Sequence, residues 1–139
     1  MTLYDIISKF LNIAKKQPNI NYVGEGDIYQ LNSLPGIDYG VFWITQTDHN
    51  QDEDTITYNL TLYYVDRLLN DGSNRLQVQS TGIVMLGNII NNFNEQNTDV
   101  EIMYDISYST FTHRFTDDCA GVFAQVSIKV DNNIGLCNY

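Results

Sequence analysis

An acidic stretch is the first place where this sequence gathers side chains that could do chemistry. In DHNQDED (residues 48–54), four oxygen-bearing side chains have the 1, 3, 5, 7 spacing of a calcium-binding loop: Asp48, Asn50, Asp52 and Asp54. Such a loop needs glycine at position 6 and glutamate at position 12, where this chain has Glu53 and Asn59. The flanking segments also have strand patterns rather than helical ones. A solvated hairpin tip is the favoured interpretation, and a calcium- or ligand-binding loop is the alternative.

A histidine and a cysteine form the second candidate. His113 stands six residues before Cys119, with Asp117 and Asp118 between them. A thiol beside an imidazole could act as a nucleophile, but this separation fixes no geometry, and no glycine-rich elbow raises the cysteine. Neither common phosphate-binding glycine pattern occurs, and two cysteines with two distant histidines give no zinc pattern. We therefore expect no enzymatic activity, cofactor or metal, a buried thiol at Cys119, and a second thiol in a loose tail at Cys137.

The charge of the chain limits its partners. The 17 acidic residues against 7 basic ones give a net charge of −10, and the basic residues are scattered. Nucleic-acid binding requires clustered lysine and arginine, so we expect no specific binding of DNA. The acidic surface favours solubility, and it would also suit a wall past which DNA slides without binding. No apolar run reaches the length of a membrane span, and the start of the chain lacks the basic-then-apolar order of a secretory signal.

The segments that must position these residues begin with a helix at residues 1–17. Its apolar stripe has helical spacing and consists of Leu3, Ile6, Ile7, Phe10, Leu11 and Ala14. Thr2 is the expected N-cap, with Asp5 completing a capping box, and Pro18 ends the helix. A stripe of this size must pack against a sheet or a neighbour.

Extended segments follow the helix. Residues 22–31 alternate around two glycines, and 39–47 have the aromatic and β-branched composition of a strand buried on both faces. Residues 55–65 alternate strictly, which predicts a long strand that pairs with 39–47 as a hairpin. One side of that strand is predicted to carry Ile56, Tyr58, Leu60, Leu62 and Tyr64.

The second half of the chain predicts one more helix and two more strands. After a turn around Asp71-Gly72, residues 75–79 are expected to be briefly extended, and Ser80 to cap a helix over 81–93. Its stripe is Ile83, Leu86, Ile90 and Phe93, with Ile89 beside it. Gly82 and Gly87 weaken that helix but allow close packing on the sheet. Strands are expected at 100–110 and 122–130, with irregular chain at 111–121 and Val122, Ala124, Val126, Ile128 and Val130 facing inward.

This order, α-β-β-β-α-β-β, predicts an α+β fold. We expect a mostly antiparallel sheet with a long hairpin and two helices packed on one face. The length suggests a single domain over 1–139. It would divide into the N-terminal helix at 1–17, an α+β core at 22–131 and a polar tail at 132–139.

Scattered positions in the second half resemble small neck and tail-joining proteins of tailed bacteriophages. They are Val65, Asp66, Arg67, Leu68, Asp71, Asn74, Ser80, Leu86 and Ile89, and then Phe111, Phe115, Asp117, Ala120, Gly121 and Ala124. The later group is similar to proteins from phages of Bacteroidetes, including the crAss-like podoviruses. The resemblance implies a tail-terminator-like or head–tail connector-like virion protein whose copies form closed rings, dodecameric or hexameric. These rings would stack among the portal, neck and tail proteins and surround the channel through which DNA passes.

Ring formation needs a heterologous interface, and the aromatic hairpin offers one. Ten tyrosines are a high load for 139 residues, and tyrosine is enriched at interfaces. The candidate interface residues are Trp43, Tyr58, Tyr63, Tyr64, Asp66 and Arg67; the aromatic rings could instead fill the core of this chain. Arg67 is expected to pair with Asp71 or with an acid of an adjoining subunit. Besides the ring subunit, a calcium- or ligand-binding module and a monomeric phage accessory protein remain open.

Overall fold

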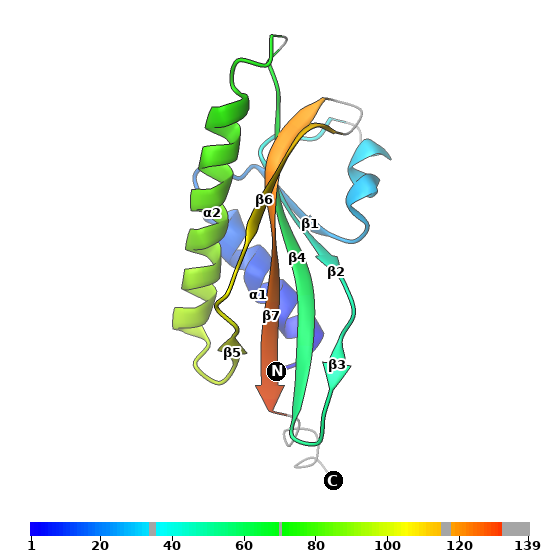
Figure 1. The fold of residues 1–139 in the computed structure, drawn as a ribbon, viewed down its shortest axis with the longest axis vertical. Helices are drawn as coiled ribbons and strands as arrows, with labels where there is room; N and C mark the ends of the chain where they lie inside the picture. The colour runs from blue at the N-terminus through cyan, green and yellow to red at the C-terminus, as the bar shows by residue number, and fades with distance from the viewer. Residues whose placement is uncertain (34–35, 70, 115–117, 132–139) are drawn as a thin grey trace.

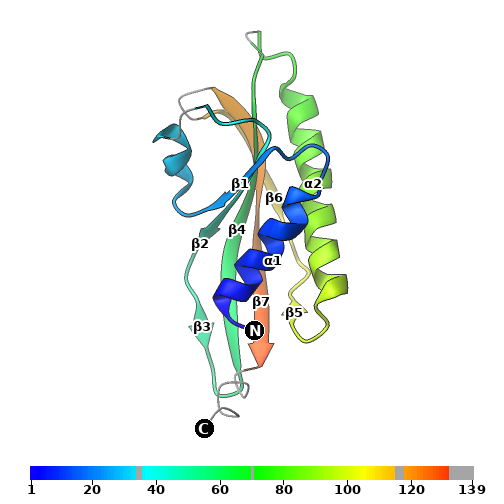
Figure 2. The same ribbon diagram turned by 180° about the vertical axis from the view of Figure 1, so that it is seen from behind.

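The computed structural model describes residues 1–33, 36–69, 71–114 and 118–131, and it places side chains at all of these except 113 and 114. A seven-stranded sheet forms the centre, and two long helices pack on one of its faces (Figure 1). The predicted α+β class, with a mostly antiparallel sheet and both helices on one face, is confirmed. Seen from behind, α1 crosses the sheet obliquely while α2 runs along its long axis (Figure 2).

The strands follow the order β1-β2-β4-β7-β5, with β3 added beside β4 and β6 beside β7. Among the strands of the described residues, only β1 and β2 are parallel neighbours, and every other pair is antiparallel. The strands are β1 (Tyr22–Glu25), β2 (Val41–Gln46), β3 (Asn50–Gln51), β4 (Thr55–Arg67), β5 (Glu101–Ile102), β6 (Tyr108–Arg114) and β7 (Cys119–Asp131). The predicted hairpin of 39–47 with 55–65 is confirmed as the β2–β4 pair.

The N-terminal helix, α1 (Leu3–Lys15), is built as the sequence predicts. The Thr2 hydroxyl accepts a hydrogen bond from the backbone N–H of Asp5, and the Asp5 carboxylate accepts one from the backbone N–H of Thr2. This reciprocal capping box satisfies two N–H groups that helix formation leaves without partners. The buried stripe meets α2, where the rings of Phe10 and Phe93 stack with centroids 4.2 Å apart.

The central strand, β4, pairs with β7 along its whole length of 13 residues. Leu60, Leu62 and Tyr64 face the two helices and are buried in the larger core, as the period-2 pattern predicts. The inward residues predicted for β7, from Val122 to Val130, are buried in the same core. This pair of strands lies inside the sheet, and the other strands pair with one or the other of them or with β2.

The second helix is longer than the sequence pattern suggested. Helix α2 covers Arg75–Gln96, so residues 75–79 are helical and Ser80 lies inside the helix rather than at its cap. Val78 and Gln79 are buried against the sheet and begin the inward face that Gly82, Met85 and Leu86 continue. The predicted extended segment RLQVQ was wrong, because an alternation over only five residues fits the period of a helix as well as that of a strand. Ile83, predicted to face inward, is instead 40% exposed.

Three extended segments also differ from the prediction. Residues 22–31 contain the short β1 and then the 3₁₀ helix η1 (Ile28–Ser33) rather than one strand. The predicted strand at 100–110 is divided into β5 and β6, which pair with different parts of β7. The region 111–121, predicted to be irregular, contains the second half of β6 and the start of β7. Burial of Phe111 on the second face of the sheet accounts for the extension of β6.

The sheet is covered on both faces, by different elements. The helices cover one face, and η1 covers part of the other, where Ile28 and Leu31 pack on Val41, Trp43 and Val65 in a second, smaller core. Both faces of β2 are therefore buried over Val41–Ile44, as its continuous apolar composition predicts. The predicted tail at 132–139 lies outside the described residues.

Candidate functional site

The acidic stretch forms a hairpin tip. Within it, β3 pairs with β4, and the Asp52 carboxylate closes the turn by accepting hydrogen bonds from the backbone N–H groups of Asp54 and Thr55 and from the Thr55 hydroxyl. These hydrogen bonds favour the ionised form and hold the pKa of Asp52 below its ordinary value. The predicted hairpin tip is confirmed. Among the described residues, no three His, Cys, Asp or Glu side chains gather as a metal site.

The cysteine of the second candidate is buried. Cys119 is fully buried at the start of β7, in the smaller core with Val65 and Phe111, so the predicted buried thiol is confirmed. The side chains of His113 and Asp117 and all of Cys137 lie outside the described residues. Asp118 lies on the exposed turn that precedes β7.

Two of the six candidate interface residues belong to the core of this chain. Trp43 is 3% exposed and Tyr64 is 2% exposed. The Trp43 indole N–H donates to the backbone carbonyl of Gly26 over 3.1 Å, which satisfies its polar atom internally. The expectation that these two rings contact a neighbouring subunit is therefore corrected: they pack on opposite faces of the sheet inside the subunit.

The other four candidates lie at or near the surface. Tyr58 is half-buried with its ring edge-on to His49, and Tyr63 is half-buried beside Phe123. The guanidinium of Arg67 lies 5.0 Å from the centre of the Tyr39 ring, a cation–π contact. The predicted partner Asp71 uses its carboxylate in a turn with the backbone N–H of Ser73. Contact of these side chains with another subunit stays a prediction.

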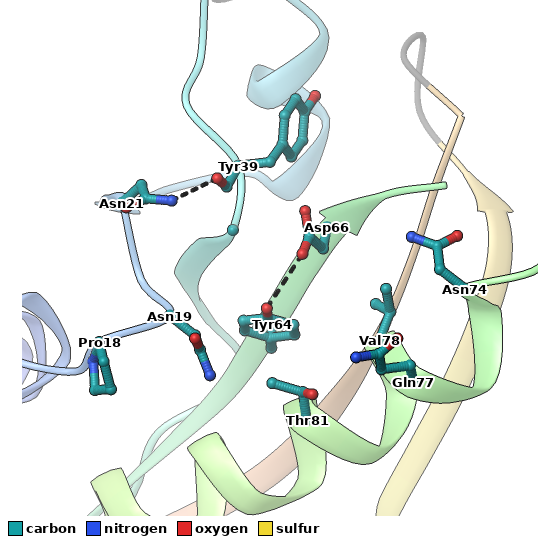
Figure 3. A pocket seen from close by; sticks show the side chains of 11 residues that line it. Pro18, Asn19, Asn21, Tyr39, Tyr64, Asp66, Asn74, Gln77, Val78 and Thr81 are labelled. Carbon is teal, nitrogen blue, oxygen red and sulfur yellow. Dashed lines mark hydrogen bonds between the residues drawn. The ribbon is translucent and has the colours of Figure 1, made fainter. Parts of the chain in front are cut away.

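A polar cavity lies where the α1–β1 connection, the start of β2, the end of β4 and the first turns of α2 meet (Figure 3). Its volume is about 440 Å³. The residues that line it are Pro18, Asn19, Asn21, Tyr39, Gly40, Tyr64, Asp66, Asn74, Gln77, Val78 and Thr81. A pocket of this size falls in the range of small-molecule sites, but most such sites are apolar, and this one is dominated by amides and hydroxyls.

Tyr64 and the charged Asp66 form a hydrogen-bonded pair in the cavity. Both side chains project from the same face of β4, because residues two apart in a strand point the same way. The Tyr64 hydroxyl donates to Oδ2 of Asp66 over 3.4 Å, and the backbone N–H of Arg67 donates to Oδ1 over 2.8 Å. Burial raises the pKa of Tyr64 far above its ordinary value, and the neighbouring Asp66 carboxylate adds to the shift. The phenol therefore stays protonated and serves as a donor.

Two asparagines hold the walls of the cavity in place. The Asn21 side chain donates to the backbone carbonyl of Tyr39 over 2.6 Å. The Asn74 side chain accepts from the backbone N–H of Leu69 and donates to the carbonyl of Arg67, which fixes the turn that leads into α2. This cavity was not predictable from the sequence, because its lining comes from four separate segments. Asn19, Asn21, Asn74 and Gln77 offered no signal beyond being amides near element ends.

The outward face of α2 is the second unusual surface. Arg75 and Glu95 are the only charged residues of this 22-residue helix, so residues 76–94 carry no charge in a chain of net charge −10. Three apolar side chains on this stretch are exposed: Leu76 at 70%, Ile83 at 40% and Val84 at 56%. We call residues 76–94 on the exposed side the uncharged face of α2. Solvent-facing helix surfaces ordinarily carry charged residues, so this face has the character of a contact surface.

No family model matches this chain, and no curated protein sequence matches it. Among the described residues, no helix has both the length and the apolar character required to cross a membrane.

Proposed function

We propose that this chain is a non-enzymatic structural subunit of a tailed-phage virion, whose copies form a closed ring in the neck or tail. The ring would join the portal or connector to the tail and surround the DNA channel. The observation that carries the proposal is the uncharged face of α2, with Leu76, Ile83 and Val84 exposed on a strongly acidic chain. The phage setting rests on the sequence resemblance alone.

Self-association of an acidic protein requires a surface without carboxylates. Two chains of net charge −10 repel each other, and like charges facing each other across a contact cost several kcal/mol. The central part of a protein interface is depleted of charge, and large apolar side chains exposed together mark interaction sites. The uncharged face of α2 meets both conditions. In a head-to-tail ring this face would contact a different surface of the next copy.

The remaining candidate interface residues do not surround the uncharged face, because Tyr63 points to the sheet face opposite the helices. In a head-to-tail ring they would instead lie at the rim of the surface that receives this face. Tyr58, Tyr63, Asp66 and Arg67 are at least partly accessible, and polar or charged groups at a rim set register and specificity more than affinity. Acidic residues elsewhere would leave a channel wall that repels the phosphate backbone, so DNA would pass without being held.

Light scattering with size-exclusion chromatography tests the self-association. We expect the wild-type chain to assemble with increasing concentration, and Val84→Glu to remain monomeric because it places a carboxylate in the uncharged face. Gln51→Glu, which adds the same charge on the exposed strand β3, should assemble as the wild type does. Circular dichroism of each variant checks that it is folded.

Mass spectrometry of purified phage particles tests the location. The chain should be found in intact particles in a fixed ratio to the portal protein. A chain that stays monomeric at every concentration and is missing from the particles would overturn the proposal. A chain that is monomeric alone but present in particles would instead indicate assembly on a template ring.

Calorimetry with calcium chloride separates this proposal from the binding-module alternative. The Asp52 carboxylate is occupied by turn hydrogen bonds, so we expect no heat of binding at the 48–54 hairpin. Micromolar binding that is lost on Asp52→Asn would favour the alternative.

A further inference from the structure

We propose that the polar cavity between β4 and α2 binds an organic cation through a primary ammonium or guanidinium group, with the Asp66 carboxylate as its counter-ion. This site adjoins the uncharged face of α2, because the exposed Gln77 belongs to both, but ligand binding in it does not depend on ring formation.

The charge of the lining selects the sign of the ligand. Asp66 is the only charged residue among the eleven that line the cavity, and no lysine, arginine or histidine is among them. Within the lining, the carboxylate therefore has no cationic partner, while its position beside the buried ring of Tyr64 reduces screening by water. An anion would meet this carboxylate without any compensating charge, so anionic ligands are excluded.

The polar atoms of the cavity suit a group with several N–H donors. The Asp66 carboxylate accepts one hydrogen bond at each oxygen, and the one from Tyr64 is long at 3.4 Å. An ionised carboxylate has about four acceptor positions, so it can accept more. Ammonium offers three donors and guanidinium five, and charge-assisted hydrogen bonds are the stronger kind.

Three further side chains are available to complete the site. The side chains of Asn19, Gln77 and Thr81 have no hydrogen-bond partner among the described residues, and Figure 3 shows them around Tyr64. Each carries an oxygen that can accept from a bound N–H group. The raised pKa of Tyr64 keeps its hydroxyl protonated, so this group orients the carboxylate and does not compete as a second anion.

The cation could belong to a free amine or to a lysine or arginine side chain of another copy of this chain. Both present the same group to Asp66. The cavity is open enough at its surface that Asn19 and Gln77 are solvent-exposed, so a side chain from a partner could enter from outside.

Nuclear magnetic resonance with n-butylammonium as the probe tests the site. We expect the side-chain amide signals of Asn19, Asn21 and Gln77 to shift in a saturable way in a ¹⁵N-labelled sample. Butyramide and butyrate, which have similar size without the positive charge, should produce no such shifts. Equal shifts with butyramide would overturn the proposal. So would the absence of shifts with n-butylammonium at about tens of millimolar, because a dissociation constant above that range would not indicate a specific site.

Variants at Gln77 make the test independent of folding problems, because this residue is exposed on the first turns of α2. Gln77→Glu adds a second carboxylate to the cavity and should tighten binding of the probe by about fivefold to tenfold. Gln77→Lys supplies an internal cation and should abolish binding.

Asp66→Asn should weaken binding of the probe at least about tenfold, while Asp99→Asn, away from the cavity, should leave probe binding unchanged. Probe binding that is indifferent to all three cavity variants would refute the assignment to Asp66.

Assembly measurements distinguish the two sources of the cation. If a side chain of another copy occupies the cavity, then both Asp66→Asn and saturating n-butylammonium should reduce self-association. If the ligand is a free amine, neither should change it. Val84→Glu provides the separation from the ring proposal, because it should block self-association and leave probe binding intact. If the chain binds the probe but never self-associates, the ring proposal is refuted and the proposed cation site is supported.

Discussion

The side-chain amide of Gln79 donates a hydrogen bond to the backbone carbonyl of Phe111, with 3.1 Å between the nitrogen and the oxygen. The same nitrogen lies 3.3 Å from the Thr112 hydroxyl, and the Gln79 carbonyl oxygen accepts from the Arg75 guanidinium. Among the described strands, β6 pairs only with β7. Gln79 therefore ties α2 to the outer edge of the sheet, and it covers backbone that could otherwise pair with another chain.

Replacing Gln79 by leucine should lower the free energy of unfolding by about 1–2 kcal/mol. The variant keeps a similar volume but loses the buried hydrogen bond to the Phe111 carbonyl and the two part-buried ones with Thr112 and Arg75. A hydrogen bond is worth about 0.5–1.5 kcal/mol net. Urea denaturation followed by circular dichroism measures the change. Gln96→Leu, on the exposed last turn of α2, is the matched control and should stay within about 0.5 kcal/mol of the wild type. Equal stability of the two variants would show that Gln79 has no anchoring role.

The two helical glycines should respond in opposite directions to alanine. A Cβ atom at Gly82 would lie 2.9 Å from Val122 Cγ2 and 3.0 Å from Tyr64 Cδ2, both in the buried core. Overpacking of about 1–3 kcal/mol should exceed the roughly 1 kcal/mol gained in helix propensity, so Gly82→Ala should destabilise. At Gly87 the nearest atom is the Tyr108 hydroxyl at 3.4 Å, an ordinary contact.

Gly87→Ala should therefore stabilise the protein by up to about 1 kcal/mol. Thermal and urea unfolding of the two variants side by side measure the difference. A stabilising Gly82→Ala would mean that α2 can move away from the sheet, against the close packing described above.

Tyr64 should govern part of the stability at high pH. Burial and the Asp66 carboxylate raise the pKa of the Tyr64 phenol in the folded chain, whereas an unfolded tyrosine ionises near pH 10. The folded state therefore holds the proton where the unfolded state releases it. This contribution to stability is fully present below about pH 10 and is lost as the pH rises towards the folded pKa.

The measurement is urea denaturation from about pH 8 to about pH 11. Tyr64→Phe should show a smaller loss of stability over this range than the wild type. Tyr4→Phe, whose ring is exposed at the start of α1, should retain the loss seen in the wild type. A Tyr64→Phe variant with an unchanged alkaline slope would contradict the buried, protonated phenol.

Asp52 should contribute to stability in the opposite pH range. The turn hydrogen bonds hold the pKa of its carboxylate below the ordinary value, so the folded chain stays ionised where the unfolded chain takes up a proton. The contribution is present above about pH 4 and is lost as the pH falls through the lowered pKa. Asp52→Asn should flatten the acid limb of the stability curve, measured by urea denaturation. The neighbouring Glu53→Gln should leave that limb as it is in the wild type.

The parts of the fold that could be predicted are those where one periodicity extends over many residues. Helix α1 has six apolar positions in register and a complete capping box, and β4 has an apolar residue at every second position from Ile56 to Tyr64. The short segments failed for the corresponding reason. RLQVQ at 75–79 is too short to distinguish a strand from a helix. The division of 100–110 into β5 and β6 arises because the two strands pair with different parts of β7, and no local sequence pattern indicates this.

By itself, the sequence determined the fold class and the long β2–β4 hairpin, because these follow from hydrophobic patterning along the chain. Only the tertiary structure decided that Trp43 and Tyr64 belong to the core, since their neighbours Gly26, Gly82 and Val122 come from distant segments. It also decided that Asn19, Asp66 and Gln77 share one cavity. Residues 47 and 11 positions apart in the sequence come together only when α1, β4 and α2 have packed, and no local periodicity encodes that meeting.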